Sequence, residues 1–69
     1  MTRIEQLRRI VERHQAARVD GFMVDATTAN MLVTVHDALG AANQERFQTI
    51  DFMRLVDFGW KHVKAGGAA

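Results

Sequence analysis

The residues most able to do chemistry in this chain are three histidines and a few carboxylates, because the sequence contains no cysteine. The histidines are His14, His36 and His62, and each falls in a different predicted helix. No two of them are four residues apart, which is the spacing that lets two histidines on one helix face hold a metal ion. The sequence therefore predicts no metal site, no cofactor site and no thiolate nucleophile.

The remaining polar residues give no better sign of catalysis. Asp25 and Asp37 have structural roles available, as a helix cap and as a surface charge. There is no glycine-rich phosphate loop, and no pairing of a nucleophile with a base is visible. His14 and His36 fall on apolar helix faces, where a core histidine is more common than a ligand. We therefore expect a protein that is not an enzyme and has no catalytic residue.

The stretch from Val19 to Gly40 contains the turn and the helix that organise the rest of the chain. Asp20-Gly21 is a favoured pair for a tight turn or a minimal hairpin, because both residues tolerate a positive φ. Asp25 is placed to cap a helix over 26–39, which is apolar over most of its circumference and should be central. Gly40 fits the position after that helix, where a left-handed backbone is needed.

Three other helices are predicted around this central one. The first covers 2–17 and begins with Thr2 and Glu5, which match a capping box. A short helix over 43–48 and a last helix over 51–64 follow, the last one capped by Thr49 or Asp51. We expect an all-α fold, a small bundle of three main helices plus one short helix, in one domain (1–64) with a flexible tail (65–69).

The core is predicted from the inner faces of these helices. Gly59 should permit close approach of another helix, with the bulk of Trp60 beside it. The residues predicted at the centre of the core are Leu32, Val33, Leu39, Val56 and Trp60.

Length and composition restrict the functional classes further. A chain of 69 residues makes one small domain, and 48% hydrophobic with 25% charged residues is typical of a globular protein. A net charge of +1 gives little global attraction to nucleic acid or anionic lipid. No apolar run approaches the length of a membrane span, and the first residues interleave charges where a signal peptide has an apolar core. We therefore expect a cytoplasmic protein that does not enter a membrane.

The outer face of the last predicted helix carries the candidate partner-binding residues, which are Arg54, Phe58, Lys61 and His62. An exposed aromatic side chain among cations can fill a pocket while the charges orient an acidic partner. The alternatives are that Phe58 is an isolated exposed residue or is covered by the first helix. In the first helix the arginines alternate with glutamates, which favours a solvated face over phosphate contacts.

A homodimer is also predicted, because a chain this small has more apolar surface than its short helices can cover. The expected contacts are the seam of the first helix or the edge of the central helix. The residues named are Ile4, Leu7 and Val11 in the first, and Met31 and Val35 in the second.

Three segments carry a family resemblance: VDGFMVDATTANMLVTVHDAL (19–39), ANQERF (42–47) and MRLVDFGWK (53–61). They resemble a family of short proteins, mostly of no known function, encoded by phages of actinobacteria (mycobacteriophage type) and by their prophages. In that family a tyrosine is common where His36 stands and a proline often occurs near Asp51, and this chain departs at both places. The resemblance implies expression in an infected or lysogenic bacterial cytoplasm, and it assigns no activity and no functional residue.

Two functions from different classes follow. The leading one is a non-enzymatic interaction protein that binds a host or phage protein, or itself, through a helical surface. The alternative is a small DNA-binding regulator whose segments 43–48 and 51–64 form a helix-turn-helix, with Arg54, Lys61 and Lys64 at phosphates. Against the alternative, the turn lacks the usual glycine and the candidate recognition helix is apolar on one full face.

Overall fold

Four helices and one short hairpin form the fold. The computed structural model describes the backbone of residues 1–67 and the side chains through Val63. In chain order the elements are α1 (Arg3–Arg13), β1 (Ala17–Val19), β2 (Phe22–Val24), α2 (Ala26–Ala38), α3 (Ala41–Thr49) and α4 (Phe52–Gly67). The predicted helical class is right for most of this chain, but the hairpin adds a small antiparallel sheet of two strands. None of the described helices is both long enough and apolar enough to cross a membrane.

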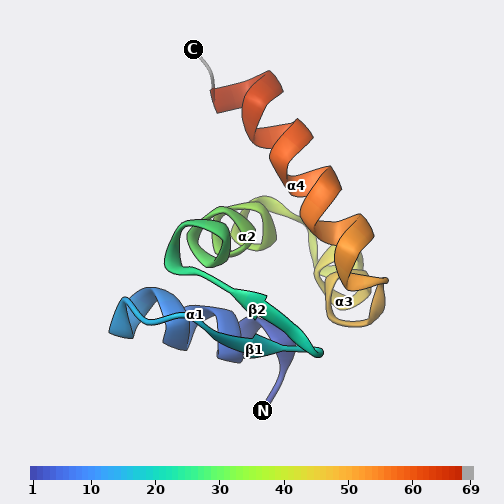
Figure 1. Cartoon of the computed structure of the whole chain (residues 1–69). Coiled ribbons are helices and arrows are strands. Elements are labelled where there is room, and N and C mark those ends of the chain that lie inside the picture. The colour runs from blue at the N-terminus through green and yellow to red at the C-terminus, as the bar shows by residue number, and fades with distance from the viewer. Residues whose placement is uncertain (68–69) are drawn as a thin grey trace.

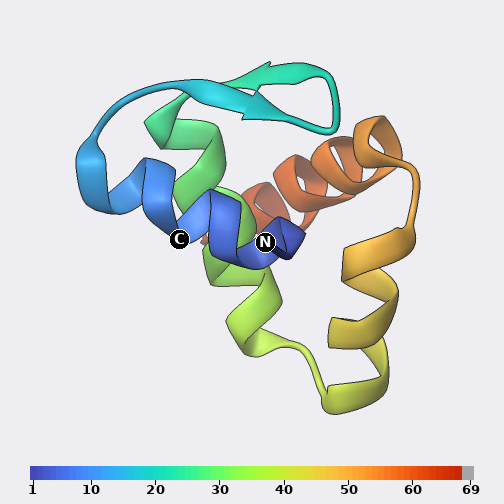
Figure 2. The same ribbon diagram turned by 90° about the horizontal axis from the view of Figure 1, so that it is seen from below.

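Helix α2 lies at the centre of the molecule. It packs against α1 on one side and against α4 on the other, and the hairpin lies across one face of the helical layer (Figures 1 and 2). The second half of α4 extends beyond the rest of the described chain, away from α1 (Figure 1). This arrangement leaves both flanks of α4 open to solvent over much of its length.

The first helix is shorter than predicted. Its capping box is confirmed, since the Thr2 hydroxyl accepts from the Glu5 amide and the Glu5 carboxylate accepts from the Thr2 amide. It ends at Arg13, because His14 takes a left-handed backbone with φ 54°. The predicted end at residue 17 is wrong because the following segment pairs instead with β2, and this pairing places Val19 in the core.

The turn at Asp20-Gly21 is confirmed. Asp20 has φ 50° and Gly21 has φ 82°, which are the positive values that a two-residue hairpin loop needs. Gly40, in contrast, is not the left-handed residue that we predicted. It has φ −72° and is the N-cap of α3, because the next helix begins one residue later at Ala41 and requires an extended cap.

The other helix ends are close to the predictions. Asp25 caps α2 by accepting from the Thr28 amide at 2.7 Å. Asp51 caps α4 by accepting from the Arg54 amide at 3.2 Å. The backbone of α4 continues into the predicted tail as far as Gly67, and residues 68–69 lie outside the described chain.

The centre of the core differs from the predicted set. Leu32 is fully buried as expected, but Val33, Leu39 and Val56 are half-buried and Trp60 is 37% exposed. The largest fully buried side chains are instead Leu7, Val19, Leu32, Val35 and Phe47. The apolar surface of α2 was predicted to extend over most of the helix, and within it the structure buries Met31 and Val35 but leaves Val33 and Leu39 half-buried.

Gly59 lies at the crossing of α2 and α4, and the predicted close approach is confirmed. A Cβ atom at this position would overlap the sulfur of Met31 and lie 3.4 Å from a methyl carbon of Leu32. The side chain of Met31 therefore fills the space beside Gly59, and the prediction that Trp60 fills it is wrong.

The predicted dimer contacts are wrong because their residues lie inside the monomer. Ile4 and Leu7 of α1 are buried, and Val11 is half-buried against the core. Met31 and Val35 of α2 are 5% and 2% exposed. These side chains hold α1, α2 and α4 together and have too little surface left for a second chain.

Arg3 joins four parts of the fold. Its guanidinium donates to the carbonyls of Phe47 and Ile50 at 2.7 Å and 2.8 Å, and to the Asp20 carboxylate at 2.8 Å. The same group lies 5.3 Å from the centre of the Phe52 ring, and the side chain is 9% exposed. One side chain therefore links α1 to the hairpin turn, to the end of α3 and to the start of α4.

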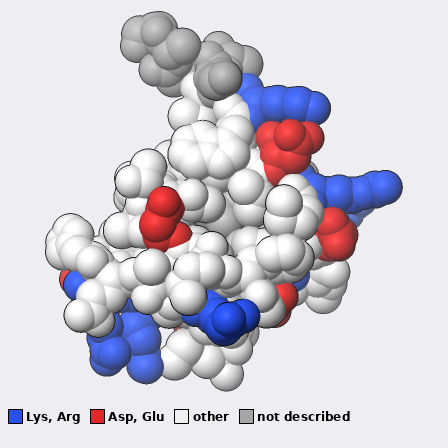
Figure 3. All heavy atoms as spheres, in the orientation of Figure 1, with Lys and Arg blue, Asp and Glu red and all other residues white. Residues whose placement is uncertain are grey.

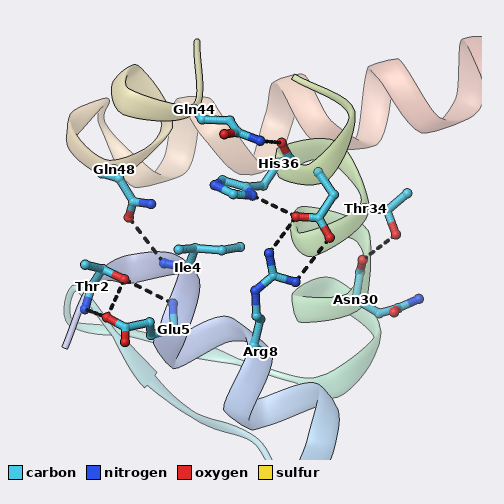
Figure 4. Close-up of polar contacts among 10 residues, drawn as sticks. Thr2, Ile4, Glu5, Arg8, Asn30, Thr34, His36, Gln44 and Gln48 are labelled. Carbon is cyan, nitrogen blue, oxygen red and sulfur yellow. Dashed lines mark hydrogen bonds and ion pairs between the residues drawn. The ribbon is translucent and has the colours of Figure 1, made fainter. Parts of the chain in front are cut away.

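A second polar cluster joins α1 to the end of α2 (Figure 4). Arg8 donates two hydrogen bonds to the Asp37 carboxylate, at 2.6 Å and 3.1 Å, and His36 Nδ1 lies 2.9 Å from the same carboxylate. The His36 side chain is nearly buried, with its ring packed at the edge of Phe47. The hydrogen bonds from Arg8 and then from His36 lower the pKa of Asp37 from 3.8 to about 2.

This lowered pKa predicts a loss of stability in acid. The ionised form of Asp37 is favoured in the folded state, so its contribution is complete above pH 3.8 and disappears as the pH falls toward 2. Asp37→Asn should therefore melt at a lower temperature than the wild type at pH 7 and decline less between pH 4 and pH 2. Thermal melts across this range test it, and parallel curves for the two proteins would contradict it.

Candidate functional site

The four candidate residues of the last helix all lie on the exposed side of α4. Arg54, Lys61 and His62 are exposed, and Phe58 is 50% exposed. Phe58 is therefore not covered by α1, which was one of the alternatives. Its ring stacks on the ring of His62, one turn later, with centroids 5.8 Å apart and planes at 16°.

The charges around Phe58 are not all available to a partner. Lys61 Nζ lies 3.1 Å from a carboxylate oxygen of Asp57, also one helical turn away. Figure 3 shows basic and acidic side chains alternating along α4 at the upper right of the view. This pair leaves Arg54 and His62 as the groups beside Phe58 that have no carboxylate partner among the described residues.

Phe58 forms one wall of an open groove between α3 and α4. The groove has a volume of about 320 Å³ and is mostly apolar. Its lining residues are Leu39, Asn43, Arg46, Phe47, Ile50, Leu55 and Phe58. Phe47 and Leu55 are buried and form the floor, whereas Ile50 is 37% exposed and stands at the rim.

The local sequence explains why this groove forms. On α3, the spacing of Asn43, Arg46, Phe47 and Ile50 places them on one side of the helix and its end. Only two residues, Ile50 and Asp51, separate α3 from α4, so the helices diverge from a short corner (Figure 2). Leu55 and Phe58 of α4 are three residues apart and face the same space.

The polar edge of the groove is basic. Arg46 is the one charged residue of the lining, and no carboxylate contributes to it. Neither Arg46 nor Arg54 forms an ion pair with any residue that the structure describes. An apolar groove with an unpaired cation at its edge suits an apolar side chain that has an acidic neighbour.

Sequence reasoning found Phe58 but missed the rest of the groove. The amphipathic pattern of α4 predicts that Phe58 is exposed, but it does not predict which residues of α3 lie beside it. Phe47 and Ile50 are the apolar residues that anchor the short helix in the sequence, yet apolar spacing does not distinguish the buried Phe47 from the exposed Ile50.

The histidines do not assemble into a site. His14 ends α1, His36 contacts Asp37 within α2, and His62 lies on the outer side of α4. Within the described part of the chain, no three side chains of His, Cys, Asp or Glu are grouped so that they could hold a metal ion.

The helix pair of the DNA-binding alternative corresponds to α3 and α4. The exposed side of α4 offers Arg54 and Lys61, of which Lys61 is paired with Asp57. The side chain of Lys64, the third predicted phosphate contact, lies outside the described residues. The charge of this helix pair is therefore mixed where the structure describes it.

Comparison of the chain with protein-family models, with curated proteins and with solved structures gave no match. The resemblance to phage proteins therefore stays a prediction, supported only by the three segments that carry it.

Proposed function

We propose that this chain is a small, non-enzymatic protein of phage type that binds a host or phage protein in the bacterial cytoplasm. The binding surface is the groove between α3 and α4, with Phe58 as its principal contact. The observation that carries the proposal is the half-exposed ring of Phe58 beside an apolar groove of about 320 Å³. A few residues, often aromatic, supply much of the binding energy of a protein interface when the partner buries them.

The shape and charge of the groove indicate the kind of partner. Its volume is at the low end of the roughly 300–1,000 Å³ of ligand pockets, and it is open to solvent between two helices. An amphipathic helix of the partner, with one or two apolar anchors, suits this shape. An acidic residue beside the anchors would meet Arg46 at the edge, so we expect an acidic amphipathic segment.

The proposal is tested by capture from lysate of an infected or lysogenic actinobacterial host, followed by mass spectrometry. Immobilised wild-type protein should retain a specific protein, and Phe58→Ala should lose it. Because Phe58 is half-exposed, the melting temperature of this variant should change by only a few degrees.

Trp60→Ala is a matched control for this experiment, since Trp60 is a partly exposed aromatic residue on the other flank of α4. This variant should still capture the partner. If Phe58→Ala captures as much as the wild type, or if Phe58→Ala unfolds, the groove is not the binding surface.

The DNA-binding alternative remains a second proposal, with the helix pair α3–α4 as its contact. It predicts binding to duplex DNA that weakens steeply as salt is raised and that is lost in Arg54→Gln. Protein capture through Phe58 with no DNA binding would remove it.

We also propose that the chain forms a homodimer, through a surface other than the ones first predicted. On one flank of α4, Met53 is 53% exposed and Trp60 is 37% exposed. Phe22 of the hairpin is 42% exposed, and its ring stacks on the ring of Phe52 at the start of α4. In Figure 3, the middle of the molecule between the hairpin and α4 is mostly uncharged. A second copy can cover such a surface without bringing like charges together.

The dimer predicts a mass of twice 7.8 kDa by light scattering at micromolar concentration. Met53→Lys should give the monomer, because it places a charge in the contact. A wild-type protein that stays at the monomer mass would remove this proposal and leave the groove beside Phe58 unaffected.

A further inference from the structure

A second groove, on the opposite part of the fold from Phe58, lies between α1 and β1. Its volume is about 160 Å³, and three arginines contribute to its lining: Arg9 and Arg13 from α1, and Arg18 from β1. Gln6 and Gln15 add amide groups, and no carboxylate is among the lining residues. Three positively charged side chains and no negatively charged one therefore border this groove.

The arginines of α1 and β1 differ in whether a carboxylate of the fold neutralises their charge. Arg3 is paired with Asp20 and Arg8 with Asp37, so two arginines of α1 have carboxylate partners. Arg9, Arg13 and Arg18 have no ion pair among the residues that the structure describes. Within α1 and β1, the arginines that form no ion pair with a described residue are the ones that line the groove.

Helix stability accounts for only part of the placement of these arginines. Arg9 and Arg13 are four residues apart on α1, and like charges at this spacing repel each other. Arg13 lies in the last turn, where a cation is favourable to the helix dipole. Arg9 has the Glu5 carboxylate one helical turn before it as a favourable neighbour. Arg18 is not in a helix, and its guanidinium donates to the Gly21 carbonyl at 3.3 Å.

We propose that this groove binds the phosphate backbone of a nucleic acid. The alternation of arginines and glutamates in the sequence of α1 favoured a solvated face instead, but neither Glu5 nor Glu12 is among the residues that line the groove. A guanidinium matches the oxygens of a phosphate with two parallel hydrogen bonds. Arg9 and Arg13 stand about 6 Å apart along the helix axis, so they can contact neighbouring phosphates of one strand while Arg18 contacts them from the other side. The phosphates of a nucleic-acid strand are part of its backbone. An acidic protein segment would have to order long carboxylate side chains to present the same charges, at a cost in conformational entropy.

The size and lining of the groove set the mode of binding. Its volume, about 160 Å³, is below that of small-molecule pockets, so it takes a single ionic group rather than a whole nucleotide. No aromatic side chain lines it, so there is no platform for stacking bases. Binding is therefore to the backbone, independent of sequence and strongly dependent on salt. It uses α1 and β1, and does not depend on the groove beside Phe58 or on the helix pair α3–α4.

The test is a titration of the full chain against fluorescently labelled duplex and single-stranded DNA, at several salt concentrations between 50 and 200 mM. The first variant carries Arg9→Gln, Arg13→Gln and Arg18→Gln together. The matched control carries Arg46→Gln, Arg54→Gln and Lys61→Gln, which removes the same net charge from the α3–α4 side. Circular dichroism melts check that both triple variants are folded. If the α1–β1 triple variant is unfolded, the single variants Arg9→Gln and Arg18→Gln take its place.

The α1–β1 variant should bind roughly tenfold more weakly or worse than the wild type at 50 mM salt, and its salt slope should be smaller by about 2–3. The control should keep most of its affinity. Competition experiments with inorganic phosphate and with polyglutamate identify the anion that binds. The proposal requires that unlabelled DNA displaces the labelled DNA far better than inorganic phosphate or polyglutamate does. The proposal is overturned if the wild type does not bind DNA, or if the control variant loses more affinity for DNA than the α1–β1 variant. It is also overturned if polyglutamate displaces the DNA at equal charge concentration.

Discussion

Leu32→Ala should reduce the free energy of unfolding by about 2–5 kcal/mol. Leu32 is fully buried in the middle of α2, and one of its methyl carbons lies at the crossing with α4, beside Gly59. Truncation removes buried apolar atoms and leaves a cavity that the two helices on either side cannot both fill. A core of this size usually supplies only roughly 3–5 kcal/mol of net stability, so the variant should be largely unfolded.

Urea denaturation followed by circular dichroism measures this loss. Thr34→Ala is the control, because Thr34 lies two residues away on the same helix, is exposed, and bonds only to the Asn30 carbonyl of its own helix. It should keep nearly the wild-type midpoint. A Leu32→Ala midpoint equal to that of the wild type would mean that α2 does not present Leu32 to the core.

The second large effect is expected at Arg3. Arg3→Met keeps most of the aliphatic stem but removes every donor, so the carbonyls of Phe47 and Ile50 lose their charged partner. Hydrogen bonds to a charged group contribute about 1.5–3 kcal/mol, so the loss should be of that order. The side chain is 9% exposed, and solvent can replace the missing bonds only in part.

Arg8→Met is the matched control for Arg3→Met, since both change an arginine of α1 that pairs with an aspartate. The Arg8–Asp37 pair is about half exposed on both sides, and such surface pairs contribute little. The urea midpoint should therefore fall much less in Arg8→Met than in Arg3→Met. Equal midpoints for the two variants would show that Arg3 is only a surface charge.

Local signals in the sequence predicted much of the fold. Thr2 and Asp25 cap their helices through side-chain bonds to amides three residues later, and such contacts can be read from spacing alone. The same holds for Asp20-Gly21, whose backbone requirement is a property of the two residues themselves.

Errors arose where tertiary contacts decided between local alternatives. The apolar spacing of α1 continued past Arg13, but burial of Val19 in the hairpin ended the helix early. The apolar faces of α2 were too broad to show whether Val33 or Val35 is buried, and packing against both α1 and α4 selected Val35. Intrinsic propensity is a weak guide in such cases.

The candidate groove was predictable only in part for the same reason. The exposure of Phe58 follows from the pattern of one helix, but its neighbours Leu39 and Ile50 come from two other segments. Arg3 is a stronger example, because its hydrogen-bond partners are 17, 44 and 47 residues away in the sequence. No pattern within one helix indicates such contacts.

The central claim is that the groove between α3 and α4 is the partner-binding surface. The most direct measurement is amide chemical-shift mapping of the isotope-labelled protein while the captured partner is added. The shifts should concentrate at the groove, on Leu39, Asn43, Arg46, Ile50 and Phe58. If they concentrate instead around Met53 and Trp60 or on α1, with the groove unchanged, the claim is wrong.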